Sequence, residues 1–300
     1  MTVDPLTSSK IKGMWRITRP LDAFIMGIGL ILSMVLSGSV VLGIPPIVYV
    51  TVFIGGFLVT GHAMVVNDII DIEIDKINEP RRVLPSGVLS IPFAKIYAIF
   101  LALIGLLLFY FIDLGGYDRL PFLWVYVLFH VLLADLYNYK LKGTGFLGNI
   151  IVAESTYGLF LAGDLFLNGK LTLVPQIVGI TAFCTSLARE IYKGIIDQKG
   201  DAEHNIRTVA VVFGPRFAKY LATSILAFCL LLLVYLFTHV YFIGQLGLLI
   251  VIILLFYILS LAPHADKPKQ SRRIKSLILI GPLILAPFLI VDQLYHIAFF

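Results

Sequence analysis

The chain has 300 residues, of which 59% are hydrophobic and 14% charged, and its mean hydropathy is +0.96. Soluble domains balance apolar and charged residues differently, so these values exclude an ordinary soluble fold and indicate an integral membrane protein. The net charge of +5 is concentrated on one side of the predicted spans, which indicates membrane orientation and not nucleic-acid binding.

Nine apolar runs are long enough to cross a hydrocarbon core about 30 Å thick as helices of about 20 residues. Helices are expected because backbone polar groups find no water in lipid, and the runs are too evenly apolar for barrel strands. We therefore predict an all-α polytopic membrane protein, with residues 1–300 as a single domain. The expected spans are 20–42, 45–66, 92–112, 120–138, 146–167, 172–193, 216–238, 243–262 and 275–297.

Two further features bound the class of protein. No small-residue cleavage site follows the first apolar run, so it is expected to remain as a membrane anchor. Both cysteines, Cys184 and Cys229, lie in apolar runs and predict neither a disulfide framework nor a thiolate metal site.

Basic residues predict the orientation. Of the 23 Lys and Arg residues, all but Arg119 and Lys170 fall on one side of the predicted spans. Positively charged loops stay in the cytoplasm, so we expect a cytoplasmic N-terminus in a multi-pass protein of the cell membrane. The N-terminal tail and the cluster Lys267–Lys275 are interpreted mainly as orienting spans and meeting anionic headgroups.

Two of the expected cytoplasmic loops, residues 67–87 and 189–214, carry a repeated polar pattern. Two aspartates and an arginine recur in one register, shifted by 126 residues: Asp71, Asp75 and Arg81 match Asp197, Asp201 and Arg207. Three matches in one register predict two related halves that bring similar loops together over one site.

The spacing of these side chains predicts a metal site. Asn67, Asp71 and Asp75 follow one another at four-residue intervals, and Asp197 and Asp201 repeat that interval. If the helices continue past the membrane edge, each set lines one helical face. Like charges on one face repel, so each set requires a cation or a cationic partner. Oxygen ligands without Cys or His favour Mg²⁺ or Mn²⁺ over Zn²⁺ or copper.

Mg²⁺ commonly takes a few carboxylates, keeps waters and bridges to substrate phosphates, so a phosphorylated ligand is expected. Solvated helix ends would explain a single D-x-x-x-D motif, whereas two copies in register favour the metal site. Basic groups expected on the same side would hold phosphate oxygens: Arg81, Arg82, Lys140, Lys142, Lys193 and Arg207. A cluster of aspartates surrounded by lysines and arginines predicts a diphosphate site.

The two loops also resemble a known family. "NDIIDIEIDKINEPRRVLPSG" and "REIYKGIIDQKGDAEHNIRTVAVVFG" are similar to the two signature loops of the UbiA superfamily of intramembrane prenyltransferases. The resemblance includes the pair Arg19–Pro20 before the first span and "YNYKLK" after the fourth. It implies a helical bundle around a central cavity, with Mg²⁺ held on a prenyl diphosphate by Asn67, Asp71, Asp75, Asp197 and Asp201. One departure is Gly194, where many relatives carry another aspartate.

The reaction that the resemblance implies breaks an allylic carbon–oxygen bond and leaves negative charge on the diphosphate. Mg²⁺ with Lys193, Arg81 and Lys140 would stabilise that charge in the transition state. An apolar cavity would keep water from the allylic cation, which Tyr137 or Tyr139 would face. The residues expected at the diphosphate are Arg19, Arg81, Arg82, Tyr139, Lys140, Lys142 and Arg207.

Within this family the loops look most like those of archaeal digeranylgeranylglyceryl phosphate synthases. These enzymes join a geranylgeranyl group to the free hydroxyl of geranylgeranylglyceryl phosphate in ether-lipid synthesis. Enzymes that prenylate an aromatic quinone precursor are the main alternative. The expected partners are a prenyl diphosphate, a lipophilic acceptor and membrane lipid, and neither a nucleic acid nor a protein partner is implied.

A cation-coupled transporter is the alternative of another class. Ionisable residues in or near the spans would favour it: His62, His130, Asp135, Glu154 and Asp164. Transporter sites, however, lie near the bilayer midplane, whereas the repeated aspartates lie at the expected cytoplasmic ends of spans.

Overall fold

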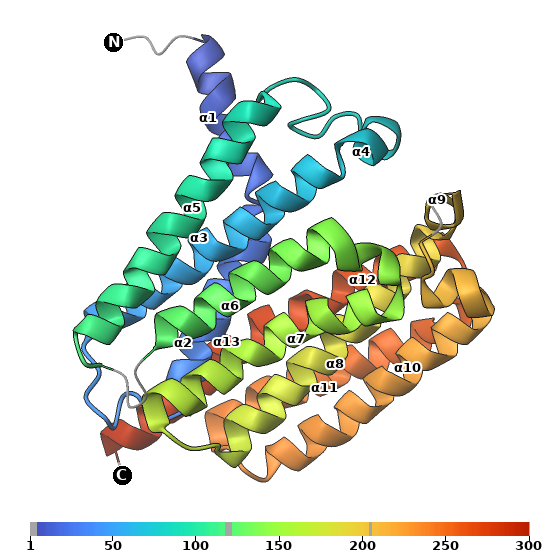
Figure 1. Ribbon diagram of the computed structural model, residues 1–300. Coiled ribbons are helices and arrows are strands. Elements are labelled where there is room, and N and C mark those ends of the chain that lie inside the picture. Colours follow the sequence, from blue (N-terminus) through green and yellow to red (C-terminus); the bar gives the residue numbers. More distant parts are fainter. Residues whose placement is uncertain (1–4, 118–121, 204–205, 300) are drawn as a thin grey trace. The chain divides into compact units, whose positions relative to one another are not determined.

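The structure, a computed structural model, describes residues 5–117, 122–203 and 206–299 (Figure 1). All regular elements within these ranges are helical, which confirms the predicted fold class. The longer helices are α2 (Pro20–Leu36), α3 (Pro46–Ile70), α5 (Ile91–Leu114), α6 (Leu123–Leu136), α7 (Phe146–Ala162), α8 (Leu173–Ile196), α10 (Val209–Phe237), α11 (Phe242–Leu261) and α13 (Ile280–Phe299). The shorter ones are α1 (Pro5–Ile17), α4 (Ile72–Asn78), α9 (Gln198–Glu203) and α12 (Pro268–Ile278).

Six helical segments in the described ranges are long and apolar enough to span a membrane, or seven if the bent pair α1–α2 is one span. The regions expected as the fourth and sixth spans are also helical, as α6 and α8. Length and composition alone identify neither as a span, because α6 has 14 residues and α8 ends in charged side chains. Residues 120–121 and Arg119, used in the sequence-based topology, lie outside the described ranges.

The chain divides into two compact units, Met1–Ile31 with Pro45–Tyr139 and Leu32–Ile44 with Lys140–Phe300. In the first unit, α3 packs along α5, and α6 packs against α5. Gly105 on α5 allows α3 and α5 to pack closely. A Cβ at this position would lie 2.8 Å from a Val59 methyl and 3.2 Å from the Gly55 carbonyl oxygen. Small residues at such crossings let helix backbones approach one another.

A buried histidine links three helices of the first unit. His62 on α3 lies 3.0 Å through Nδ1 from the Ala98 carbonyl oxygen on α5 and 3.2 Å through Nε2 from Asp135 on α6. A carbonyl oxygen only accepts, so Nδ1 donates to Ala98. His62 therefore supplies an interhelical contact of the first unit.

In the second unit, α8 packs against α7, α10 and α12, while α11 packs along α13. Asp164, fully buried, accepts hydrogen bonds from Ser37 (3.0 Å), Thr172 (2.7 Å from its hydroxyl) and Gln176 (2.7 Å). Asp292, also buried, accepts from the backbone N–H groups of Tyr241 and Gly244 at the start of α11. Asp164 and Asp292 thus have structural partners.

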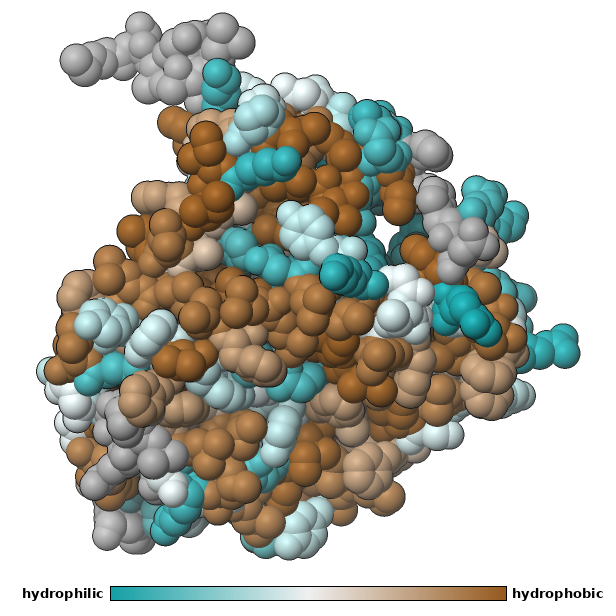
Figure 2. Space-filling view, in the orientation of Figure 1, coloured by the Kyte–Doolittle hydropathy of each residue, from teal (hydrophilic) through white to brown (hydrophobic). Residues whose placement is uncertain are grey.

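The outer faces of the helices are apolar. Large hydrophobic side chains such as Leu103, Leu231 and Ile253 are exposed, and Figure 2 shows hydrophobic residues over most of the visible face. Large exposed apolar areas are unusual in a soluble monomer. Such a surface is suited to contact with lipid chains.

The loop that follows α6 is held by a close backbone contact. Gly145 has φ +68°, and a Cβ at this position would overlap the carbonyl oxygen of Arg207. Gly143, two residues earlier, has no heavy atom within 4 Å of the corresponding Cβ position. Gly145 therefore brings the loop that contains Lys142 against the segment that begins α10.

We expect Gly145→Ala to lower the melting temperature in detergent, because the methyl group meets backbone that cannot move aside and the left-handed conformation disfavours alanine. Gly143→Ala is the matched control and should melt within a degree or two of the wild type, as surface changes usually do. Equal melting temperatures for the two variants would contradict the contact described for Gly145.

Candidate active site

The first signature loop begins as a continuation of α3. The helix ends at Ile70, Asp71 has φ −82° and ψ 1°, and α4 follows with Asp75 as its fourth residue. The backbone N–H of Asp71 bonds the Asn67 carbonyl oxygen at 2.9 Å, and that of Asp75 bonds the Asp71 carbonyl at 2.8 Å. The four-residue intervals thus remain one helical turn each, as the sequence predicts.

The second signature loop repeats this backbone. The helix α8 ends at Ile196, Asp197 has φ −94° and ψ 3°, and Asp201 is the fourth residue of α9. Its backbone bonds have the same pattern, from Asp197 N–H to the Lys193 carbonyl at 3.0 Å and from Asp201 N–H to the Asp197 carbonyl at 2.9 Å. Each motif therefore places one aspartate at a helix break and a second one turn later.

The carboxylates of the first motif are buried together. Asp68, Asp71 and Asp75 are 4%, 9% and 5% exposed. Burial raises the pKa of the Asp75 carboxyl, Asp71 and Asp68 raise it further, and the Arg82 guanidinium opposes them without cancelling the effect. The charged form of Asp75 is thus disfavoured.

Asp68 has no role in the sequence-based prediction, yet it pairs with two arginines. Its Oδ1 lies 2.6 Å from Arg19 and 3.7 Å from Arg82, and Arg82 also bonds Asp75 at 2.6 Å. Asp68 precedes Asp75 by seven residues, which places both on nearly the same side of a helix. That spacing is the signal by which the sequence could have identified Asp68.

Arg19 lies between α1 and α2, where the helix pair bends by 49°. Its φ of 47° is uncommon for a residue other than glycine. The guanidinium donates to Asp68 at 2.6 Å and to the Asn67 side-chain oxygen at 3.3 Å. The Asn67 amide in turn donates to Asn138 at 3.1 Å, so the predicted metal ligand Asn67 is oriented from two sides.

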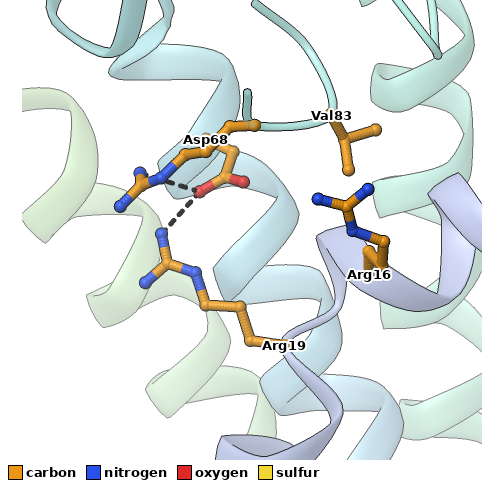
Figure 3. A pocket seen from close by; sticks show the side chains of 5 residues that line it. Arg16, Arg19, Asp68 and Val83 are labelled. Carbon is orange, nitrogen blue, oxygen red and sulfur yellow. Dashed lines mark hydrogen bonds and ion pairs between the residues drawn. The ribbon is translucent and has the colours of Figure 1, made fainter. Parts of the chain in front are cut away.

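A pocket lies next to these ion pairs (Figure 3). Its volume is about 170 Å³. It lies in the first unit and is lined by Arg16, Arg19, Asp68, Arg82 and Val83. Three guanidinium groups and one carboxylate give the lining a net positive charge. Arginines in this number favour a phosphate or carboxylate ligand.

In the second unit, basic residues approach the acidic pair. Burial raises the pKa of Asp201 to about 6, and Asp197 adds to the rise; Lys193, Lys142 and the Thr208 hydroxyl act in the opposite direction. Lys193 and Lys142 are thus close enough to act on this pair electrostatically. The sequence does not identify Glu190, which is buried and lies 3.1 Å from Arg189 and 3.9 Å from Lys193.

Other predicted site residues lie at the surface of their own unit. Tyr139 is exposed in the first unit, as is Arg81, whose carbonyl accepts a 3.5 Å hydrogen bond from Arg16. Lys140 and Arg207 are exposed in the second unit. These four side chains are exposed and therefore accessible to a ligand.

The donor set fits a cation that shares its ligands with a substrate. Among the described residues, no three His, Cys, Asp or Glu side chains are grouped as a complete metal site. Mg²⁺ is satisfied by one or two carboxylates, waters and substrate phosphates, and each aspartate pair has the oxygen donors that the protein part of such a set requires.

The bend at Arg19 generates a prediction about backbone strain. Arg19→Ala removes the ion pair and keeps the strained φ, whereas Arg19→Gly removes the pair and relieves the strain. We expect the alanine variant to be less stable than the glycine variant by about 1 kcal/mol, measured by chemical unfolding in detergent. Greater stability of the alanine variant would show that φ at this position is not left-handed.

The raised pKa of Asp201 predicts a pH effect in metal-free protein. Because the folded form binds this proton more tightly than the unfolded chain, the stabilisation is complete below pH 3.8 and is lost as pH rises through about 6. The side chain of Asp201→Asn is neutral at every pH. In EDTA, the melting temperature of this variant should therefore rise relative to that of the wild type between about pH 4 and pH 7. The exposed Glu203→Gln is the control, and a pH-independent difference for Asp201→Asn would contradict the shift.

Comparison with known proteins identifies the family of this chain. The model of the UbiA prenyltransferase family matches residues 26–280. The digeranylgeranylglyceryl phosphate synthase of Methanobrevibacter smithii is 30% identical over 280 residues, which cover 89% of this chain and 93% of that protein.

Two solved structures have the same fold. One, from a study of digeranylgeranylglyceryl phosphate synthase in membranes, is 26% identical with a TM-score of 0.70, covering 95% of this chain and 99% of its own. The other, a UbiA homolog from Archaeoglobus fulgidus bound to DMAPP and Mg²⁺, is 16% identical with a TM-score of 0.65, covering 96% and 99%. The chain therefore belongs to the UbiA prenyltransferase family.

Proposed function

We propose that this prenyltransferase moves a geranylgeranyl group from its diphosphate to the free hydroxyl of geranylgeranylglyceryl phosphate, with Mg²⁺ as cofactor. The name of the Methanobrevibacter smithii relative supports the acceptor. The Mg²⁺ and prenyl diphosphate in the Archaeoglobus fulgidus homolog support the cofactor and the donor class.

The observation that carries the proposal is the repeated helix–aspartate–helix geometry. Both copies place an aspartate at the helix break and another one turn later. The pKa of the second aspartate is raised in each copy, at Asp75 and at Asp201. Paired carboxylates whose charge is disfavoured in the free protein are suited to bind a divalent cation, because the cation offsets their repulsion.

In the proposed site, Asn67, Asp71 and Asp75 hold Mg²⁺ in the first unit and Asp197 and Asp201 in the second. When bound, Mg²⁺ neutralises charge on the diphosphate as it leaves. The register of 126 residues between the two acidic sets supports their action on a single diphosphate. The same register supports two related halves within one domain.

Basic side chains would complete the diphosphate site. Lys193 and Lys142 act electrostatically on Asp201, so a phosphate held there would come within their field. Charged hydrogen bonds from them would strengthen as charge develops on the leaving group. The remaining members of the proposed diphosphate set are Arg81, Tyr139, Lys140 and Arg207.

We also propose nine membrane spans and a cytoplasmic N-terminus. Nine spans with a cytoplasmic N-terminus would place both signature loops, and hence the active site, on the cytoplasmic side. The distribution of Lys and Arg supports this orientation, since only Arg119 and Lys170 fall on the other side.

A turnover assay tests the function. Purified protein in detergent would receive geranylgeranyl diphosphate and Mg²⁺ with either geranylgeranylglyceryl phosphate or 4-hydroxybenzoate, and diphosphate and prenylated product would both be measured. We expect Mg²⁺-dependent prenylation of the glyceryl phosphate. If only the aromatic acid is prenylated, the enzyme belongs to quinone synthesis. If neither acceptor is prenylated, the result favours the transporter.

Substitutions in the two motifs test the metal ligands. Asp71→Ala and Asp197→Ala should each lower kcat by at least roughly a hundredfold while the protein still folds and inserts. Glu73→Ala is the matched control, since this carboxylate lies between Asp71 and Asp75 but is exposed and pairs with Lys76. Near-normal activity of both aspartate variants would contradict the metal site.

A further inference from the structure

The pocket in Figure 3 has more positive charge than its carboxylate balances. Asp68 is paired with Arg19 and Arg82, and Arg82 is shared with Asp75. The third guanidinium, Arg16, donates a long hydrogen bond of 3.5 Å to the Arg81 carbonyl and is exposed. Its charge is therefore available to a ligand in the pocket.

The arginines are held in place by groups that a ligand need not displace. Asp68 is 4% exposed and fixes Arg19 through a 2.6 Å ion pair. Arg19 retains a left-handed φ of 47° while making this contact. Strain of this kind costs of order 1–3 kcal/mol and persists where the surroundings impose it, typically at functional sites. The pocket is thus preorganised for an anion.

The surroundings of Arg16 indicate an anion attached to a lipid. Trp15, the preceding residue on α1, is 58% exposed and stacks on Phe57 of α3 with ring centroids 5.8 Å apart. Exposed tryptophans of membrane proteins gather at headgroup level. Arg16 on the same short helix would lie at the depth at which a lipid presents its phosphate.

Two phosphorylated substrates take part in the proposed reaction, and they make different demands. The diphosphate must leave, and the aspartate pairs with Mg²⁺ serve that step. The acceptor phosphate does not react, so it requires only charge and fixed donors, which arginines supply without a metal.

We propose that Arg16, with Arg19 and Arg82, binds the phosphate monoester of the lipid acceptor in this pocket. The inference rests on the proposed function, and it assigns Arg19 and Arg82, which the sequence places at the diphosphate, to the second phosphate. Arg16 becomes a specificity residue that selects an acceptor with a phosphate.

Steady-state kinetics with two acceptors test the proposal. Arg16→Gln should raise KM for geranylgeranylglyceryl phosphate about tenfold, since one charged hydrogen-bond partner is lost, and leave KM for geranylgeranyl diphosphate unchanged. With geranylgeranylglycerol, which lacks the phosphate, the variant should react at the wild-type rate. Arg16→Lys keeps the charge without the forked donors and should fall between the two.

Lys12→Gln is the matched control, because Lys12 is exposed, lies one helical turn before Arg16 on α1 and does not line the pocket. It should retain both KM values. A rise in KM for the diphosphate in Arg16→Gln would assign the pocket to the donor and overturn the proposal. An equal loss with the phosphate-free acceptor would overturn it as well.

A binding measurement separates this inference from the proposed function. Affinity for geranylgeranylglyceryl phosphate would be measured without diphosphate or Mg²⁺, in nanodiscs of phosphatidylcholine and of phosphatidylglycerol. Binding that depends on Arg16 in both lipids supports the pocket even if no turnover occurs. If the enzyme turns over but the affinity for the acceptor does not depend on Arg16, the pocket assignment is overturned while the proposed function stands. If the affinity depends on Arg16 in phosphatidylcholine but not in phosphatidylglycerol, the pocket binds anionic lipids in general, which also overturns the assignment.

Discussion

The repulsion between carboxylates at the two helix breaks is the constraint on which the rest of the site depends. Two or three aspartates within one helical turn of each other destabilise the chain that carries them unless positive charge is nearby. The first unit supplies that charge from its own arginines, through Asp68 and Asp75. The second has lysines near its aspartates, but burial and the charge of Asp197 outweigh them and raise the pKa of Asp201 to about 6. The two copies share a backbone but differ in how far the protein itself balances the acids.

Because of this difference, a metal ion would meet different partners in the two copies. Arg82 bonds Asp75 directly, so a metal that binds there must coexist with an arginine or displace its hydrogen bond. Asp197 is exposed and reaches no comparable guanidinium in the contacts described, so it can turn towards a metal with little rearrangement.

The sequence predicts the helical fold and both motifs because their signals are local. Apolar run length identifies most spans, and four-residue intervals predict the turn-by-turn placement of Asp71 and Asp75, which the backbone bonds confirm. The ion pair between Arg19 and Asp68 joins positions 49 residues apart, and no periodicity encodes such a contact. The left-handed φ of Arg19 is equally invisible, since only glycine would normally signal it. Run length also predicts a span at 120–138, where the described helix α6 has only 14 residues.

The close contact at Gly145 has a consequence for chemical probes. This position tolerates no added atom, yet Gly143, in the same loop and next to Lys142, faces open space. A cysteine introduced at Gly143 could therefore carry a spin label or a fluorophore without disturbing the backbone. Such a reporter would sense the approach of an anion to Lys142 in solution and would make substrate arrival visible one molecule at a time.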